Sequence, residues 1–305
     1  MSRTLTVRRA GPQVTVQDLG RPGYLARGLS RGGAADRLAL AEGAVLLGQA
    51  PGLAALELAG FGGGFEVSAP TRIALTGAPM PATVGDRSVA WNTSFLLLPG
   101  EVLEIGTATA GIYGYLSVAG GIDTPPLLGS RAVDLVAGVG EKLEAGAVLP
   151  LGADPDPSCP PMRLDSEPRF AGGDVRIVPG AQTAFYDPET RARFERTEFT
   201  RDTRGNRQGV QLAFDGAPFE AQGQRTILSE VIVPGDIQMT GDGVPFVLLP
   251  ECQTTGGYPR IGSVLPEDLA LVAQAMPGVR LRFRFLPVEE ARAAHVPEAK
   301  RFAAL

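Results

Sequence analysis

The sequence contains few of the residues on which the commonest catalytic and structural sites depend. Its only histidine is His295, and its only cysteines are Cys159 and Cys252. A Ser-His-Asp or Cys-His catalytic site requires a histidine inside the fold, whereas His295 lies in a charged, alanine-rich tail. Two cysteines do not make a disulfide framework, and no Cys/His cluster has the spacing of a metal site. Neither a GxxxxGK[ST] nucleotide loop nor an HExxH zinc motif occurs.

Long runs of one charge sign or of apolar residues are also missing. The net charge is -5 over 305 residues, and no basic block is present, which argues against nucleic-acid binding. No uninterrupted apolar run is long enough to span a bilayer, and residues 1–9 contain no apolar signal core. We therefore expect a cytoplasmic protein that binds neither nucleic acid nor a membrane.

Turn-forming residues, by contrast, are abundant, with 40 glycines and 26 prolines. The segments between them are mostly short and typical of strands, as at residues 72–75, 94–98, 101–105, 113–118 and 245–249. Helices are expected only at residues 34–47, after Asp187-Pro188 and after Pro266. Many short strands with few helices predict an all-β (mainly β) fold, with a barrel or sandwich in each half.

A proline-rich cluster at residues 152–168 divides the chain nearly in half. It contains five prolines and few apolar residues, which is the composition of a linker. The prediction is an N-terminal domain at residues 1–155, a linker at 156–170, a C-terminal domain at 171–290 and a tail at 291–305.

Two polar stretches in the first half are candidates for a functional site. Gln17, Asp18 and Arg21 lie among turn residues, and the Arg21 guanidinium could bind a carboxylate or a phosphate with two hydrogen bonds. The alternative is an Asp18–Arg21 ion pair that only braces a glycine turn. Gly32 and Gly33 precede the first expected helix, where free N–H groups and the helix dipole favour an anion.

The second half contains a polar, glycine-containing loop at residues 253–258, directly after an apolar strand. Such loops often carry function because a rigid sheet positions them. The side chains of Gln253, Thr254 and Thr255 could bind an amide, which has both a donor and an acceptor. Asn206 and Arg207 add a further amide and a further cation. The alternative is a hydrophilic surface loop.

Together these stretches resemble the biotin-dependent carboxyltransferase family, which includes the C subunit of 5-oxoprolinase, the regulator KipA, and part of urea carboxylase. The family is also described as allophanate hydrolase subunit 2. The resemblance extends from about residue 7 to about residue 285. Its most specific segments are Thr15–Tyr24, Gly32–Leu40, Tyr115–Gly138, Asn206–Leu212, Ile227–Gln238 and Gln253–Val264.

The resemblance implies a cyclophilin-like β-barrel in each half and a polar cleft. In that cleft it implies catalytic roles for Asp18, Arg21 and Arg207. Gly32 and Gly33 would hold an anion or a nucleotide, and no residue is expected to bind a metal ion. The residues expected to bind substrate are Gln17, Asn206, Gln253, Thr254, Thr255 and Tyr258.

The sequence departs from the family pattern in one of these segments. Relatives usually show SNRMGYRL, whereas Gly205, Gln208, Val210 and Gln211 replace four of those residues here. Gln211 stands where the second arginine is expected, so one fixed cation is lost. Glu251-Cys252 before the polar loop is a further difference. These changes bear on the substrate more than on the fold.

Three functions are consistent with the resemblance. The first is the C subunit of an ATP-dependent 5-oxoprolinase, in which ATP with Mg is bound by the complex. That complex would contain a subunit-B (KipI-like) partner and a further A-type partner, and it would open a small lactam or amide. The second is one half of a carboxyltransferase that moves a carboxyl group from carboxybiotin, on a separate carrier, to urea or a similar amide. The third is a non-enzymatic, KipA-like regulator of a histidine-kinase inhibitor.

Overall fold

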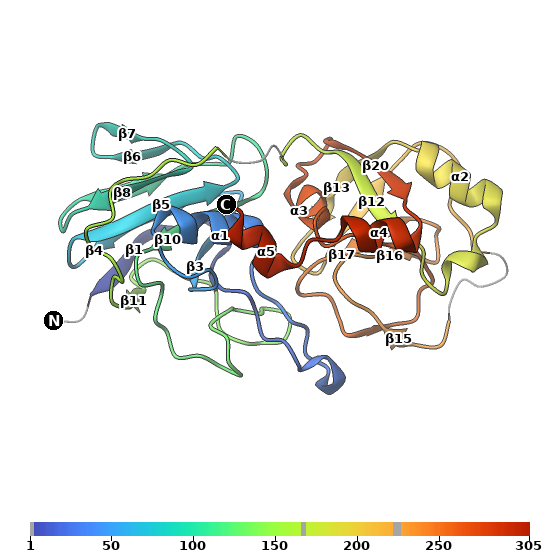
Figure 1. Ribbon diagram of the computed structural model, residues 1–305, viewed down its shortest axis with the longest axis horizontal. Helices are drawn as coiled ribbons and strands as arrows, with labels where there is room; N and C mark the ends of the chain where they lie inside the picture. Colours follow the sequence, from blue (N-terminus) through green and yellow to red (C-terminus); the bar gives the residue numbers. More distant parts are fainter. Residues whose placement is uncertain (1–2, 166–168, 222–226) are drawn as a thin grey trace. The chain divides into compact units, whose positions relative to one another are not determined.

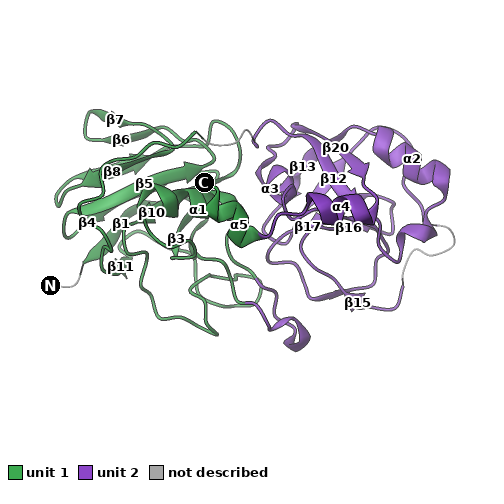
Figure 2. Cartoon of the chain, viewed as in Figure 1, with its two compact units in different colours: residues 1–21, 32–168, 298–305 green, residues 22–31, 169–297 purple. Residues whose placement is uncertain are grey.

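The computed structural model describes residues 3–165, 169–221 and 227–305 of the chain. The chain forms two compact units (Figure 2). Unit 1 comprises Met1–Arg21, Gly32–Pro168 and Glu298–Leu305, and unit 2 comprises Pro22–Arg31 and Arg169–Pro297. Residues 22–31 thus belong to unit 2, although the chain on both sides of them belongs to unit 1. After the main part of unit 2, residues 298–305 belong to unit 1 again.

Unit 1 contains two antiparallel sheets (Figure 1). The first sheet contains, in spatial order, β11 (Val148–Pro150), β1 (Thr4–Ala10), β4 (Gly63–Val67), β9 (Val102–Ile105), β6 (Ala82–Val84) and β7 (Arg87–Val89). The second contains β2 (Val14–Gln17), β3 (Ala55–Ala59), β10 (Tyr113–Val118), β5 (Thr71–Gly77) and β8 (Thr93–Leu97). Both sheets contribute to a single apolar core, which includes Phe65 from one sheet and Leu116 from the other.

The helix α1 (Arg37–Leu46) packs against β5 and β10 of the second sheet. Its start is encoded locally, because the Asp36 carboxylate accepts a hydrogen bond from the Ala39 amide at 3.0 Å. Gly48, with φ +62°, follows its C-terminus. The short helix α5 (Glu298–Ala303) returns from unit 2 and contacts α1, where Glu298 pairs with Arg37 at 2.8 Å.

Unit 2 is built around a closed barrel. Its strands are, in spatial order, β12 (Gly173–Val178), β19 (Arg260–Val264), β16 (Asp236–Met239), β17 (Pro245–Leu248), β14 (Gly209–Ala213), β13 (Phe199–Gly205) and β20 (Arg280–Phe285). The pair of β12 with β20 is parallel, and the other pairs in the barrel are antiparallel. A separate two-stranded sheet joins β15 (Glu230–Val231) to β18 (Thr255–Gly256).

The sequence pattern explains the inside of this barrel. In β20 arginines alternate with Leu281 and Phe283, so the apolar residues point inward and the arginines outward. Phe194 and Phe199 belong to the same core, with ring centroids 4.9 Å apart. Phe194 is supplied by α2 (Pro188–Arg196). The other helical segments of unit 2 are η1 (Leu25–Arg27), η2 (Thr183–Phe185), α3 (Leu269–Gln274) and α4 (Val288–Ala294).

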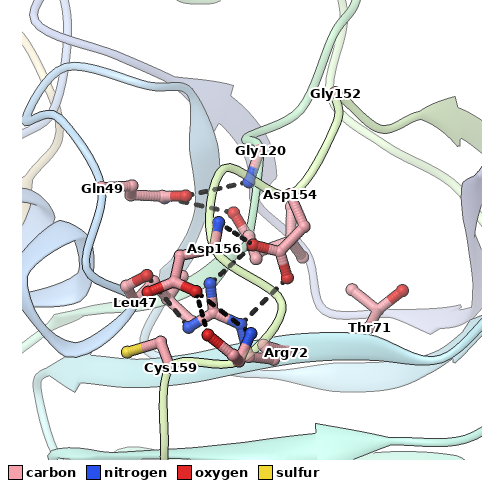
Figure 3. A network of polar contacts seen from close by, with 12 residues as sticks. Leu47, Gln49, Thr71, Arg72, Gly120, Gly152, Asp154, Asp156 and Cys159 are labelled. Atoms are coloured by element: carbon pink, nitrogen blue, oxygen red, sulfur yellow. Dashed lines mark hydrogen bonds and ion pairs between the residues drawn. The ribbon is translucent and has the colours of Figure 1, made fainter.

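The first part of the proline-rich segment is anchored to unit 1 (Figure 3). The Arg72 guanidinium donates to both carboxylate oxygens of Asp154, at 2.9 and 2.6 Å, and to the Leu47 carbonyl at 3.0 Å. This ion pair holds the pKa of Asp154 below its ordinary value of 3.8. Of the predicted linker at 156–170, residues 166–168 lie outside the described residues.

The mainly β fold class predicted from the sequence is confirmed. The three expected helices are present as α1, α2 and α3. None of the helices in the described ranges has the length and apolar composition needed to cross a membrane.

Candidate functional site

The polar residues of the first stretch lie at and after the end of β2, at the edge of the second sheet. Gln17 ends that strand, and the loop that follows carries Asp18 and Arg21. All three side chains are buried, with 0%, 8% and 1% of their surface exposed, respectively. The loop packs against residues 130–133, which are more than 100 positions away in the sequence. The site is therefore a tertiary arrangement of two loops.

The Asp18 carboxylate holds these two loops together. Its Oδ1 accepts hydrogen bonds from the Gly20 amide at 2.7 Å and the Ser130 hydroxyl at 2.6 Å. Its Oδ2 accepts from the Arg131 amide at 2.7 Å. Asp18 and Arg21 are both described, and no hydrogen bond or ion pair joins them. The alternative expectation of an Asp18–Arg21 pair is therefore wrong, because Asp18 is satisfied by the neighbouring loop.

The Arg21 guanidinium is buried but only partly satisfied. Its Nη2 donates to the Ala132 carbonyl oxygen. Its Nε and Nη1 atoms are buried and have no hydrogen-bond partner among the described residues. A buried donor without an acceptor costs about 1–3 kcal/mol, more when the group is charged. Such a group is rare in folded proteins unless a ligand or a water completes it.

The Gln17 side chain is also only partly satisfied, but the atom without a hydrogen-bond partner is an acceptor. Its Nε2 donates to the Thr15 hydroxyl at 3.1 Å and to the Val133 carbonyl at 3.0 Å. Its Oε1 is buried and has no donor among the described residues. Gln17 and Arg21 are thus anchored on consecutive carbonyls of one segment, and each keeps unused hydrogen-bonding capacity. One offers an acceptor and the other offers donors, which is what an amide group needs.

The glycine turn at residues 32–36 packs directly on this loop. Gly33 has φ +85°, and a Cβ there would lie 2.6 Å from the Gly20 amide nitrogen. A Cβ on Gly32 would lie 3.4 Å from Arg21 Nη1 and 3.6 Å from a carboxylate oxygen of Asp134. Only glycine allows this close approach, so the turn packs directly beside the Arg21 guanidinium.

The amides after the two glycines are already used within unit 1. The Ala34 amide donates to the Asp18 carbonyl at 2.9 Å, and the Ala35 amide donates to the Glu57 carboxylate at 2.8 Å. The Asp36 amide donates to the Tyr115 hydroxyl at 2.8 Å. These three N–H groups are therefore not open to an external anion, and the turn serves to position its neighbours.

Glu57 and Tyr115 form the buried support of this turn. The Tyr115 hydroxyl donates to Glu57 Oε2 at 2.6 Å, and both residues are at most 1% exposed. Burial, and then the charges of Glu57 and Asp36, raise the pKa of Tyr115 well above its ordinary value of 10.0. The phenol therefore remains a neutral donor, which the sequence alone did not reveal.

In unit 2, Asn206 and Arg207 lie in the turn between β13 and β14. Asn206 is exposed, and its Oδ1 accepts from the Gln208 amide at 2.8 Å. Arg207 is buried, and its Nε donates to Glu251 Oε1 at 2.5 Å. The two charged side chains are only 5% and 2% exposed. Arg207 thus has an internal carboxylate partner, which ties this turn to the residue two positions before Gln253.

The loop at residues 253–258 lies at the surface of unit 2. Gln253, Thr255 and Tyr258 are exposed, and Thr254 is partly buried. Thr255 pairs with Val231 in the two-stranded sheet. The loop is thus supported by backbone pairing, and its side chains are available to a ligand or a partner.

Gln238 on β16 was missed by the sequence reasoning. It is 3% exposed, and its Nε2 is buried without a partner among the described residues. A Cβ on Gly256 would lie 2.5 Å from that nitrogen, so the loop at 253–258 passes closely over it. Its position at the end of the characteristic Ile227–Gln238 segment is the only sequence signal that could have identified it.

Carboxylates are frequent in both units, but within residues 3–165, 169–221 and 227–305 no three His, Cys, Asp or Glu side chains gather as a metal site would require. Neither Cys159 nor Cys252, both of which are described, forms a disulfide.

Comparison with known sequences agrees with the resemblance noted above. A family model described as "Carboxyltransferase domain, subdomain A and B" matches residues 27–285. The 5-oxoprolinase C subunit of Escherichia coli (strain K12) is 33% identical, and the match covers 98% of this chain and 96% of that protein. The protein of the same name from Haemophilus influenzae is 31% identical, with 92% and 90% covered.

Solved structures show the same fold. The crystal structure of TTHA0988 has a TM-score of 0.85 and 31% identity, and the match covers 93% of this chain but 56% of that one. The crystal structure of the Kluyveromyces lactis urea carboxylase has a TM-score of 0.82 and 26% identity, with 95% and 28% covered. The chain therefore spans about half the length of the first of these structures and about a quarter of the second.

Proposed function

The chain belongs to the family of carboxyltransferase domains with subdomains A and B, and from this premise we propose that it is the C subunit of a 5-oxoprolinase. One observation carries the proposal. The match to the C subunit of the Escherichia coli 5-oxoprolinase runs almost end to end in both chains, at 98% and 96% coverage. In the urea carboxylase structure, by contrast, the matching part is 28% of a larger chain. We also propose a cytoplasmic location, which fits two cysteines that form no disulfide.

The substrate of such an enzyme is a small lactam with a carboxylate. We propose that Gln17 and Arg21 bind it, because their unused atoms complement its groups. Gln17 Oε1 would accept the ring N–H, and Arg21 Nε and Nη1 would donate to the carbonyl oxygen or to the carboxylate. A fixed cation beside the carbonyl oxygen stabilises negative charge that develops there when the ring opens.

We propose that Asp18 and Arg207 each act through other residues of their own unit. Asp18 uses both carboxylate oxygens to fix the two loops that carry Gln17, Arg21 and their carbonyl anchors. Arg207 fixes Glu251 and so the start of the loop at 253–258. The exposed residues Asn206, Gln253, Thr255 and Tyr258, with Thr254, remain proposed contacts for the substrate or for a partner protein.

The residues of this chain do not fit a complete site for ATP with Mg. In the described ranges, no cluster of carboxylates is suited to a metal ion, and the three amides that follow Gly32-Gly33 are bonded internally. We therefore assign nucleotide binding to the partner proteins, one of the subunit-B (KipI-like) type and one of the A type.

The test is reconstitution of this chain with its B-type and A-type partner proteins. ADP release that depends on 5-oxoproline, and that is lost with the Arg21→Lys and Gln17→Leu variants, is the expected result. Lysine keeps the charge but cannot reproduce the fixed geometry of the guanidinium. Absence of 5-oxoproline-stimulated ADP release from the wild-type complex would refute the assignment. Tight partner binding without turnover would instead favour a KipA-like regulator.

The likeness to urea carboxylase at a TM-score of 0.82 supports a second candidate, one half of a carboxyltransferase. Carboxybiotin and urea also present amide N–H and carbonyl groups, which Gln17 and Arg21 could bind. Transfer of labelled carboxyl from a carboxybiotin carrier to urea, without 5-oxoproline-dependent ADP release, would select this function.

A further inference from the structure

The barrel strand β16 of unit 2 carries two buried polar side chains on its outer face. Along this strand Asp236 and Gln238 alternate with Ile237 and Met239. Successive side chains of a strand point to opposite faces, so the polar pair faces outward when the apolar pair faces the barrel core. Asp236 and Gln238 are nevertheless each only 3% exposed. Another segment therefore covers this part of the outer face.

The covering segment is the small two-stranded sheet of β15 and β18. We term residues 230–232 and 254–257, which contain these two strands, the flap. A Cβ on Gly256 of the flap would lie 2.5 Å from Gln238 Nε2 and 3.0 Å from Ile232 Cδ1. The flap backbone therefore passes directly over the Gln238 amide group.

The surroundings of Gln238 beneath the flap are apolar on one side and polar on the other. Phe246 lies opposite Gln238 on β17, and Arg260 lies opposite it on β19. Residues that lie directly opposite each other on paired strands project from the same face of the sheet. Phe246 packs against the apolar cluster that contains Ile232 of the flap. The Gln238 amide thus lies between an aromatic ring and a guanidinium.

The Arg260 guanidinium is already engaged with carboxylates of unit 2. Its Nη1 donates to Asp236 Oδ2 at 2.9 Å, and its Nη2 donates to Glu230 Oε2 at 2.8 Å. Two carboxylates thus face one guanidinium, which leaves this group with a net negative charge. An anionic ligand would be repelled by that charge, whereas a neutral one would not.

A second buried glutamine in the same unit shows that the fold is able to satisfy such a side chain. Gln182 is 4% exposed, and its Nε2 donates to Glu230 Oε2 at 2.6 Å. Its Oε1 accepts from the Arg260 amide at 2.8 Å. Gln238 Nε2, in contrast, is buried and has no hydrogen-bond partner among the described residues. Such a donor is unfavourable, and it is rare unless a ligand or a water supplies the acceptor.

The flap can open without breaking the barrel. Its strands β15 and β18 form a separate sheet, and each is two residues long. Val231 and Thr255 of the flap are exposed. A two-stranded sheet is marginally stable in water by itself, so the flap depends on its contacts with Arg260 and the apolar cluster. Opening it would bring Gln238 Nε2 within reach of a small molecule.

From this arrangement we propose that unit 2 contains a binding site for a small neutral amide, in which Gln238 Nε2 donates to the carbonyl oxygen of the ligand. The class includes carboxamides, ureas and lactams without a charged group. The site lies between the flap and the outer face of the barrel. It goes beyond the proposed function, because it belongs to unit 2 and uses neither Gln17 nor Arg21 of unit 1.

The test is a titration of the ¹⁵N-labelled full chain with acetamide, followed by NMR spectroscopy. The side-chain NH₂ signals of Gln238 and the backbone amide signal of Gly256 should shift and saturate. The side-chain signals of Gln49 should stay in place, because that amide is bonded to the Val118 carbonyl and the Gly120 amide within unit 1. Acetate, which has a similar shape and a negative charge, should bind at least about tenfold more weakly.

Two variants separate the Gln238 donor from the rest of unit 2. Gln238→Leu should weaken acetamide binding, followed at Gly256, by about tenfold, the usual effect of losing one neutral hydrogen bond. Its denaturation midpoint should not fall, because leucine replaces a donor without a partner among the described residues. Gln208→Leu is the matched control, since Gln208 is a half-buried glutamine of the same unit, and it should change binding less than about threefold.

Several outcomes would overturn the proposal. If acetamide shifts neither Gln238 nor Gly256, the amide holds at most a water and the site is refuted. Equal binding of acetate, or unchanged binding in Gln238→Leu, would refute the role of Gln238 as a donor to a neutral carbonyl. A shift at Gly20 without one at Gly256 would assign amide binding to unit 1 alone. Because this titration needs no partner and no ADP release, its failure is distinct from failure of the proposed function.

Discussion

Replacing Arg21 with methionine tests whether this guanidinium serves a ligand or the fold. Methionine has a similar length and no charge, so packing around the side chain is largely retained. We expect 5-oxoproline-dependent ADP release by the reconstituted complex to fall about 100- to 1000-fold, the usual effect of removing a donor that stabilises developing charge. The unfolding free energy of the isolated chain should change by less than about 2 kcal/mol.

The small stability effect follows from two opposing contributions. The variant removes two buried N–H donors without partners, each of which costs about 1–3 kcal/mol in the wild type. It also removes the bond to the Ala132 carbonyl, which costs about 1–3 kcal/mol. Loss of attraction to the nearby Asp134 carboxylate costs about 2–3 kcal/mol at an effective dielectric constant of about 20. The terms nearly cancel.

Arg207 provides the matched control, because it is equally buried but has an internal partner. Arg207→Met removes the buried cation that pairs with the Glu251 carboxylate, so it should cost about 3–5 kcal/mol in chemical denaturation. The double variant Arg207→Met/Glu251→Leu should recover most of that loss. The pair of arginines thus contrasts a satisfied and an unsatisfied guanidinium within one chain.

Two results would contradict the reasoning on Arg21. If the Arg21→Met variant lost more than about 3 kcal/mol of unfolding free energy, Arg21 would behave like Arg207, as half of an internal ion pair. Retention of activity within about threefold, with the protein folded, would remove Arg21 from the substrate site.

Three further predictions concern the supports of the fold. Gly33→Ala places a Cβ 2.6 Å from a backbone nitrogen and should cost at least about 2 kcal/mol by denaturant titration, whereas Gly28→Ala, also at positive φ but with open space, should cost about 1 kcal/mol. Asp187→Ala removes the cap of α2 and should lower stability by about 1 kcal/mol, seen as a lower melting temperature. Asp154→Asn should destabilise at neutral pH, and its difference from wild type should vanish in acid. Because Arg72 lowers the pKa of Asp154, the stabilisation by this ion pair is complete above pH 3.8. It is lost as the pH falls through the lower folded-state pKa. A stability difference between Asp154→Asn and wild type that is unchanged at pH 2 would contradict this prediction.

Short-range signals in the sequence determined much of the secondary structure. The Asp187-Pro188 pair marks the start of α2 because an aspartate cap and a first-turn proline act within one helical turn. The alternation of arginine with Leu281 and Phe283 identifies a strand with one buried and one exposed face for the same local reason. The glycine and proline content predicted the mainly β class, and the characteristic segments predicted the family.

The roles of the polar candidates could not be predicted in the same way. Arg21 and Arg207 look alike in the sequence, since each is an arginine in a polar, glycine-containing turn. Arg207 is neutralised by Glu251, 44 positions away, whereas Arg21 donates to a carbonyl 111 positions away and keeps two donor atoms without a hydrogen-bond partner among the described residues. Asp18, which the sequence suggested as the partner of Arg21, is instead occupied by Ser130 and the Arg131 amide.

The sequence by itself therefore determined which residue types were available for the chemistry and where the turns and strands begin. Only the tertiary structure decided which polar atoms are left unsatisfied once the chain has folded. The physical reason is that hydrogen-bond satisfaction and burial depend on atoms brought together from distant parts of the chain, whereas caps, turns and strand alternation depend on neighbours within a few residues.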